Sequence, residues 1–160
     1  MEILFGTFIL ITTFFIMEFV AWFAHKFVMH GFLWNLHYDH HNQPKGFLQK
    51  NDTFFLIFAI PSWLFIMFGA IDGFDYKSYI GFGILLYGLA YFLVHEVLIH
   101  QRLKKLRRFL FKNVNNNYLK VLIKAHHTHH KYLGKTPGES FGMLIVHKKF
   151  YNTQRVRDVG

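Results

Sequence analysis

Cysteine is absent from this sequence, which excludes a disulfide framework and any metal site built on thiolates. No linker, low-complexity tract or convincing repeat of about 20–50 residues interrupts the chain. Acidic residues are also scarce, because 9 Asp and Glu stand against 18 Lys and Arg and leave a formal net charge of +9. With no boundary to divide them, the 160 residues are expected to form a single domain over 1–160.

Long stretches of the chain carry almost no charge. Ile3 to Ala24 contains one charged residue, Glu18, and Thr53 to Ile71 contains none. Ser78 to Val94 is also uncharged, and its apolar pattern continues to Ile99. Each stretch approaches the ~20 residues that a helix needs to cross a ~30 Å hydrocarbon core, where backbone groups must be paired internally. The sequence therefore predicts an all-α integral membrane protein with three transmembrane helices, over about 3–24, 53–71 and 78–98.

Lysine and arginine are unevenly placed, and their positions predict an orientation. A basic run follows the third stretch: Arg102, Lys104, Lys105, Arg107, Arg108 and Lys112. The connector 72–77 carries two acids and one base. By the positive-inside rule, the loop 25–52 and the chain after residue 100 are expected on the cytoplasmic side of a bacterial inner membrane, with the N-terminus outside. The basic run is interpreted as attraction to membrane lipids, and no nucleic-acid partner is expected beside three spans.

Three local features complete the expected secondary structure. The segments 102–114 and 118–130 are predicted to be helices on the cytoplasmic side, the first of them amphipathic and lying in the membrane plane. Asn51 and Asp52 are expected to cap the start of the second span.

Histidine is abundant, with 12 in the chain, and ten of the twelve fall into four groups. The spacings are HxxxxH, HxxHH, HxxxxH and HxxHH. The groups are His25 and His30; His37, His40 and His41; His95 and His100; and His126, His129 and His130. Because the first and third spans end at the first and third groups, all four groups are expected to meet at the cytoplasmic surface of the membrane.

The histidine spacing favours a site for two metal ions. Neutral imidazole binds Fe, Zn, Cu and Ni, and residues i, i+3 and i+4 share a helix face, so each HxxHH can point three rings at one place. Ten ligands exceed the four of an ordinary structural zinc site and suit two iron ions with about five each. The rings of each HxxxxH lie about 140° apart on an ideal helix, so they require a bulge, a helix end or two different metals. Gly31 favours a helix end after the first pair. His127 and His147 fall outside the pattern and are not predicted as ligands.

Three acids lie close enough in sequence to support these ligands. Glu18 shares a helix face with His25, and Asp39 and Glu96 each adjoin a histidine. All three are candidates to accept a ring N–H from a ligand. Glu18 could equally be a protonated side chain shielded from lipid, and Asp39 and Glu96 could face water.

The motifs resemble a known family. The stretches MEFVAWFAHKFVMHGFLWNLHYDHH, NDTFF, YGLAYFLVHEVLIHQR and AHHTHH followed by GKTPGESFGML are similar to bacterial β-carotene 3-hydroxylases of the fatty acid hydroxylase superfamily, over roughly residues 10–145. The resemblance implies a non-haem di-iron monooxygenase of carotenoid biosynthesis that uses O2 and electrons from reduced ferredoxin and its reductase. The implied reaction hydroxylates C3 of the β-ionone rings, taking β-carotene to β-cryptoxanthin and zeaxanthin. It also implies that the ten histidines are the catalytic metal ligands, with zinc able to replace iron in purified protein.

Two other functions remain open at this point. The same chemistry serves membrane hydroxylases and desaturases that act on fatty acyl chains or sterols. A membrane protein that binds metal without catalysis is the third reading. Formation of zeaxanthin would distinguish the carotenoid hydroxylase from the other lipid-modifying enzymes. Iron content together with oxygen consumption would distinguish both kinds of enzyme from a protein that only binds metal.

Overall fold

The computed structural model describes residues 2–42 and 48–151, so the predicted domain 1–160 includes a few residues outside the described parts. In those parts every regular element is helical. The elements are α1 (Glu2–Phe23), η1 (Ala24–Phe32), α2 (Trp34–His41), η2 (Lys50–Asp52), α3 (Thr53–Ile71), α4 (Tyr76–Tyr91), η3 (Phe92–Ile99), α5 (Lys104–Leu110), α6 (Asn117–His129) and η4 (Lys148–Phe150).

Three helical stretches are long and apolar enough to cross a membrane, as predicted. They run over Ile3–Phe32, Lys50–Ile71 and Tyr76–Ile99. Their outer surfaces are covered with large apolar side chains such as Phe8, which is 66% exposed, and Trp63, which is 60% exposed. Such a surface is stable in lipid and unfavourable in water. The all-α membrane class with three spans is therefore confirmed.

Small residues let α4 pack between α1 and α3. A Cβ added at Gly81 would lie 2.6 Å from the Ile66 side chain of α3, and one at Gly83 would lie 2.7 Å from Thr13 of α1. Ser62 Oγ also donates a hydrogen bond to the Gly81 carbonyl at 2.8 Å. Because lipid gives helices no hydrophobic reason to associate, such close contacts and interhelical hydrogen bonds stabilise the bundle.

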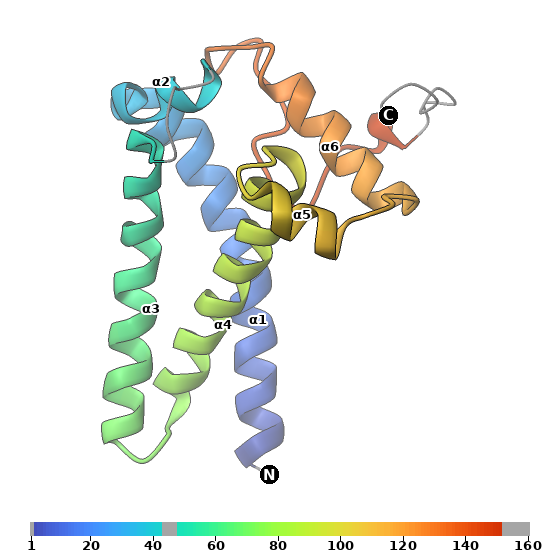
Figure 1. Ribbon diagram of the computed structural model, residues 1–160. Coiled ribbons are helices and arrows are strands. Elements are labelled where there is room, and N and C mark those ends of the chain that lie inside the picture. The colour runs from blue at the N-terminus through green and yellow to red at the C-terminus, as the bar shows by residue number, and fades with distance from the viewer. Residues whose placement is uncertain (1, 43–47, 152–160) are drawn as a thin grey trace.

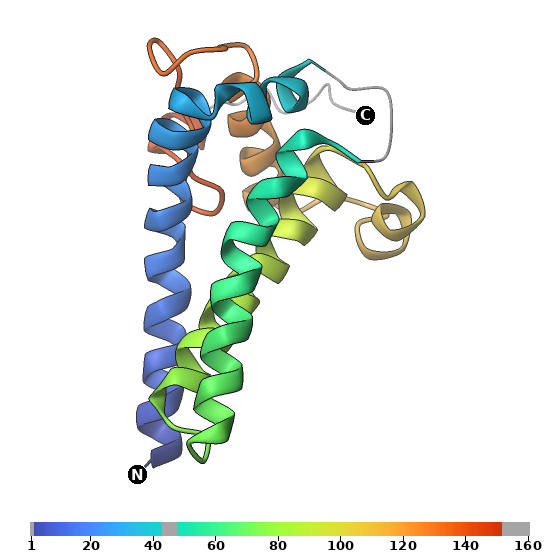
Figure 2. The ribbon, with the colours of Figure 1, turned by 90° about the vertical axis from the view of Figure 1, so that its left-hand side faces the viewer.

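The shorter helices gather at one end of the bundle. Figure 1 shows α2, α5 and α6 at the end opposite both the N-terminus and the α3–α4 connection, and Figure 2 shows the same arrangement from the side. α6 begins where the Asn116 side chain accepts hydrogen bonds from Tyr118 N and Leu119 N. α5 is shorter than the predicted helix 102–114. The backbone is not helical at Gln101 or at Leu103, and ion pairs to Asp52 and Glu96 hold Arg102 between them. All four histidine groups lie at this end.

Two glycines of α4 should respond in opposite ways to the same substitution. Gly83→Ala forces a methyl group into α1 and is expected to lower the stability by about 1–3 kcal/mol. Gly88→Ala is the matched control, because a Cβ there meets nothing within 4 Å, and alanine should stabilise the helix by up to about 1 kcal/mol. Thermal unfolding in detergent measures both. Equal melting temperatures for the two variants would contradict the packing described here.

Candidate metal centre

Two π-helical turns bring the paired histidines together. His25 and His30 lie in η1, and His95 precedes His100 at the end of η3. A π-helix closes its hydrogen bonds between residues five apart, as His100 N donating to His95 O at 2.9 Å does here. Side chains five apart therefore face the same way. Of the three ways predicted to bring an HxxxxH pair together, the structure uses a helical bulge. The first helix is also interrupted at Gly31, as predicted, because the backbone there is not helical.

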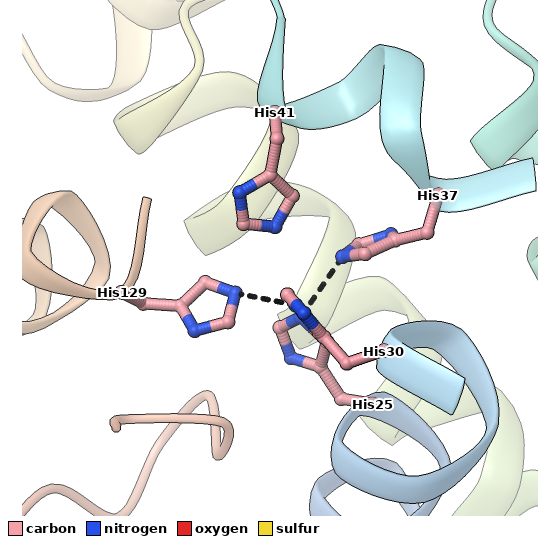
Figure 3. Close-up of side chains that lie close together, drawn as sticks. All are labelled: His25, His30, His37, His41 and His129. Carbon is pink, nitrogen blue, oxygen red and sulfur yellow. Dashed lines mark hydrogen bonds between the residues drawn. The ribbon is translucent and has the colours of Figure 1, made fainter. Parts of the chain in front are cut away.

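The first cluster takes rings from three parts of the chain. His25 and His30 come from η1, His37 and His41 from α2, and His129 from α6, and one ring nitrogen of each lies within 4.8 Å of the others. Figure 3 shows these five rings converging on a common centre. The Nε2 atoms of His25 and His37 are 3.1 Å apart, and those of His30 and His129 are 3.2 Å apart.

The second cluster adjoins the first. His40, His95, His100 and His126 each place a ring nitrogen within 4.8 Å of the others. His130 joins them, because its Nε2 lies 2.8 Å from Nε2 of His126. The His130 ring is also 4.3 Å, between centroids, from the His41 ring of the first cluster. The structure thus assembles all ten predicted histidines into two neighbouring groups of five.

Each HxxHH motif is shared between the two clusters. In α2 the outer residues His37 and His41 face the first cluster, whereas His40 faces the second. In α6 the arrangement is reversed, since His129 faces the first cluster and His126 and His130 face the second. The expectation that one motif points three rings at one place is wrong. The spacing i, i+4 keeps two rings on one side, and position i+3 lies far enough around the helix to serve the neighbouring cluster.

Six of the ten rings are oriented by a hydrogen bond from Nδ1 to an oxygen outside the clusters. Three rings donate to backbone carbonyls: His25 to Phe141 at 2.9 Å, His30 to Leu133 at 3.0 Å and His129 to Glu139 at 3.0 Å. Three donate to side-chain oxygens: His37 to Asn51 at 2.6 Å, His40 to Gln49 at 3.3 Å and His95 to Glu96 at 2.6 Å. These oxygens only accept, so Nδ1 carries the proton and the Nε2 lone pair points inward.

The inward lone pairs suit metal ions, because several of them have no hydrogen-bond donor within the described parts of the chain. His25 and His37 both donate through Nδ1, so neither Nε2 has a proton to donate across their 3.1 Å contact. Among the residues that the structure describes, no hydrogen-bond partner meets the buried Nε2 atoms of His40 and His95 or either ring nitrogen of His41. Buried polar atoms are almost always satisfied. Two ligand nitrogens at about 2.1 Å from one cation stand roughly 3 Å apart, as these do.

Burial keeps the rings in the form that binds metal. Burial, together with the charge that neighbouring imidazoles would carry, lowers the pKa of His37 to about 3, against a raising effect of the Asn51 hydrogen bond, and lowers the pKa of His130 to about 4. The pKa of His126 is also lowered well below its ordinary value by burial and by the charge that His95 would carry if protonated. These rings are therefore neutral at physiological pH, and a neutral imidazole is the metal ligand.

Of the three acids predicted to support the ligands, the structure brings one against a ring. Glu96 Oε1 accepts the hydrogen bond from the His95 ring, and Glu96 Oε2 forms an ion pair with the Arg102 guanidinium at a distance of 2.8 Å. Asp39 instead accepts from the backbone N–H of Lys50 at 2.7 Å, because it points away from the rings toward the start of α3. Glu18 likewise contacts no histidine and bonds to backbone N–H groups of a later loop.

Other supporting groups were not predicted from the sequence. Of the two residues predicted to cap the second span, Asp52 does so, because its Oδ2 accepts from Gln49 N at 3.0 Å while the side chain also pairs with Arg102. The Asn51 side chain instead accepts from His37. Gln49 and the three loop carbonyls carry no motif that identifies them, because any residue offers a carbonyl oxygen. His127 and His147 are exposed and lie outside both clusters.

Removing the amide that orients His37 should weaken metal binding without unfolding the protein. In Asn51→Ala the ring loses its acceptor and its fixed tautomer, and loss of such a partner typically lowers metal affinity by about 10–100-fold. Asn42→Ala is the control, because the Asn42 side chain caps α2 by donating to Tyr38 O and touches no ring. Metal retained after dialysis against graded chelator measures the effect. Equal retention in the two variants would contradict the role of Asn51.

Comparison with known proteins agrees with the histidine pattern. The fatty acid hydroxylase family model matches residues 10–153. A β-carotene hydroxylase of Pantoea ananas is 40% identical over 131 residues, covering 81% of this chain and 71% of that protein. A β-carotene hydroxylase of Paracoccus sp. (strain PC1) is 33% identical over 140 residues, covering 86% and 82% respectively. The chloroplastic β-carotene 3-hydroxylase 2 of Arabidopsis thaliana is 32% identical over 138 residues, covering 83% and 43%. No solved structure matches. The resemblance read from the motifs is thereby confirmed, and the chain belongs to the fatty acid hydroxylase family.

Proposed function

We propose that this chain is a β-carotene 3-hydroxylase. It hydroxylates C3 of each β-ionone ring and converts β-carotene to β-cryptoxanthin and then to zeaxanthin. Two observations support the substrate and the reaction together. The chain is 33–40% identical to bacterial proteins named β-carotene hydroxylases over more than four fifths of its length. It also gathers ten imidazoles, seven of them buried and three partly buried, at one end of an apolar helical bundle.

Two iron ions are the proposed cofactors. The first cluster would hold one through His25, His30, His37, His41 and His129, and the second would hold the other through His40, His95, His100, His126 and His130. Iron fits better than zinc because zinc has no redox chemistry. Bound iron would supply the electron transfer that activates O2 and oxidises a C–H bond with no acidity. A five-histidine set leaves room for one further ligand in a six-coordinate shell.

The chain's own residues place an apolar ring beside the histidines and keep water away from them. His37, His95 and His129 are at most 2% exposed. The Phe141 ring lies 5.0–5.6 Å, between centroids, from His25, His30 and His129, and gives the first cluster an apolar wall. β-Carotene is about as long as the ~30 Å hydrocarbon core, so its terminal ring reaches the level of a site at the end of the spans. Exposed phenyl rings along the spans offer the polyene an apolar surface.

The proposed orientation puts the site on the cytoplasmic side of the membrane and the N-terminus outside. The basic segment around α5 lies at the histidine end of the bundle, which is the end that the positive-inside rule assigns to the cytoplasm. An acidic ferredoxin, supplied with electrons by its reductase, is the proposed electron donor and would meet this basic surface. Anionic lipid headgroups would be attracted by the same charges.

Pigment analysis tests the substrate and the ligands. In a host that makes β-carotene and supplies ferredoxin and its reductase, the chain is expected to produce zeaxanthin. His40→Ala should abolish the product while the protein still inserts in the membrane, since that ring sits in the second cluster. His127→Ala, which changes an exposed histidine of α6 between the proposed ligands His126 and His129, should retain activity.

Three outcomes would contradict this proposal. Unchanged β-carotene alongside oxygen consumption with acyl or sterol lipids would indicate another hydroxylase or a desaturase. Metal binding without oxygen consumption would indicate a binding protein, provided that iron rather than zinc occupies the purified sample. Zeaxanthin formation by His40→Ala would remove that residue from the ligand set.

Charge reversal on α5 tests the electron donor separately. Lys104 and Lys105 are exposed, and Lys104→Glu with Lys105→Glu is expected to raise the KM for ferredoxin about 10-fold, with kcat at saturating ferredoxin unchanged. The difference should shrink as salt is raised, because exposed charges are screened beyond about 8–10 Å at physiological ionic strength. An unchanged KM at low salt, with the variant still in the membrane, would exclude these lysines from the docking surface.

A further inference from the structure

A carboxylate lies buried inside the first span and is not used by the histidine clusters. Glu18 is 5% exposed. Its Oε1 accepts hydrogen bonds from three consecutive backbone N–H groups, those of Met143, Leu144 and Ile145, each at 2.9 Å. Its Oε2 accepts from the hydroxyl of Tyr87 at 2.7 Å. Four donors thus satisfy both oxygens of a carboxylate in a place where an unpaired polar group would be costly.

Two spans independently fix the depth of this contact. Glu18 lies seven residues before His25 in α1, and Tyr87 lies eight residues before His95 in α4. At 1.5 Å per residue, both side chains start about 10–12 Å deeper in the bundle than the histidines. Residues 143–145 must therefore reach that depth. Figure 2 shows the segment that follows α6 descending beside α1 before the chain returns toward η4.

A loop at this depth needs a partner for its backbone. Irregular backbone within the apolar layer leaves N–H groups unpaired, and each unpaired group costs several kcal/mol in hydrocarbon. Glu18 supplies acceptors for three of them, and Tyr118 OH donates to Leu144 O at 2.6 Å. The side chains from Phe141 to Val146 are all apolar. A Cβ added at Gly142 would lie 2.9 Å from Glu18 Oε1 and 3.1 Å from the Ile145 carbonyl, so a side chain there would crowd the contact.

The same loop orients the first cluster. Phe141 lies two residues before Met143, and its carbonyl is the acceptor that fixes the His25 ring at 2.9 Å. The Phe141 ring contacts His25, His30 and His129. We propose that Glu18 is a positioning residue of the metal centre: it pins residues 141–146 as a loop dipping into the membrane, and through Phe141 it sets the orientation of His25. The importance of this role for catalysis rests on the proposed function, whereas the contacts between Glu18, the loop and His25 do not depend on it.

The absence of native cysteine makes the loop directly observable. Ile145→Cys places one thiol in the chain at a residue that is 69% exposed and yet, by this proposal, faces lipid. The protein in lipid nanodiscs, with both faces accessible, is treated with a charged maleimide and with an apolar one. Lys131→Cys is the matched control for water exposure, since Lys131 is exposed just after α6. Both thiols are then examined alone and together with Glu18→Leu, Glu18→Gln or Gly142→Ala.

The expected pattern separates positioning from general instability. The thiol introduced by Ile145→Cys should react with the apolar reagent alone when Glu18 is present, whereas the thiol introduced by Lys131→Cys should react with both reagents. Glu18→Leu and Gly142→Ala should open the loop thiol to the charged reagent and lower the iron content from about two ions per chain to about one. The chelator concentration that strips the labile ion should fall by about 10–100-fold, the usual effect of losing a group that orients a ligand. Glu18→Gln keeps an oxygen for the loop and should preserve both readouts.

Two results would overturn the proposal. One is reaction of the Ile145→Cys thiol with the charged reagent while Glu18 is present. The other is retention of both iron ions and of the labelling pattern in Gly142→Ala, which carries the test if Glu18→Leu does not fold. Neither readout depends on carotenoid turnover. Failure to form zeaxanthin with the expected labelling and iron content would therefore count against the proposed function and leave the role of Glu18 in place.

Discussion

The lone pairs of neutral imidazoles repel one another, and this constraint governs the histidine end of the molecule. Six Nδ1–H groups are engaged by oxygens outside the clusters, so the corresponding Nε2 atoms face inward as acceptors with no donor among them. Such an arrangement is costly without a positive charge in each cluster. A metal ion bound in each cluster would therefore stabilise this end of the bundle, and the packing around the clusters must hold the rings close against their mutual repulsion.

Different helices supply the rings of the two clusters. η1 gives two rings to the first cluster and η3 carries His95 of the second, while α2 and α6 each supply both clusters. A shift of α2 would thus move His37 and His40 together and disturb both clusters at once. The π-helical turns carry the other essential contribution. An ordinary α-helix would turn one member of each HxxxxH pair away, whereas the i to i+5 hydrogen bonds align both members at the end of a span.

The sequence predicted the features that depend on composition and spacing. It did not predict which residues touch where the contact depends on the rotation of a helix about its axis or on the distance along that axis. Uncharged stretches predicted the three spans, and the repeated histidine spacing predicted all ten clustered residues. The division of each HxxHH between two clusters was not predicted, because it depends on how α2 and α6 face their neighbours. Glu18 shares a helix face with His25, but the two side chains start about 10 Å apart along the axis, which is beyond the reach of a glutamate. Asp39 and Glu96 each adjoin a histidine in sequence, yet Glu96 accepts from its neighbour's ring whereas Asp39 accepts from Lys50 N, and sequence spacing does not distinguish the two cases.

The two clusters differ in what holds their outer hydrogen bonds. Three rings of the first cluster, those of His25, His30 and His129, donate to carbonyls of the irregular segment 133–141. In the second cluster the outer acceptors are Gln49, beside the start of the second span, and Glu96, which is fixed by Arg102. A loop that lacks its own ladder of hydrogen bonds opens at lower free energy than a packed helix. An ion bound in the first cluster should accordingly be more labile than one bound in the second, and in the role proposed for it the buried carboxylate of Glu18 would limit that lability.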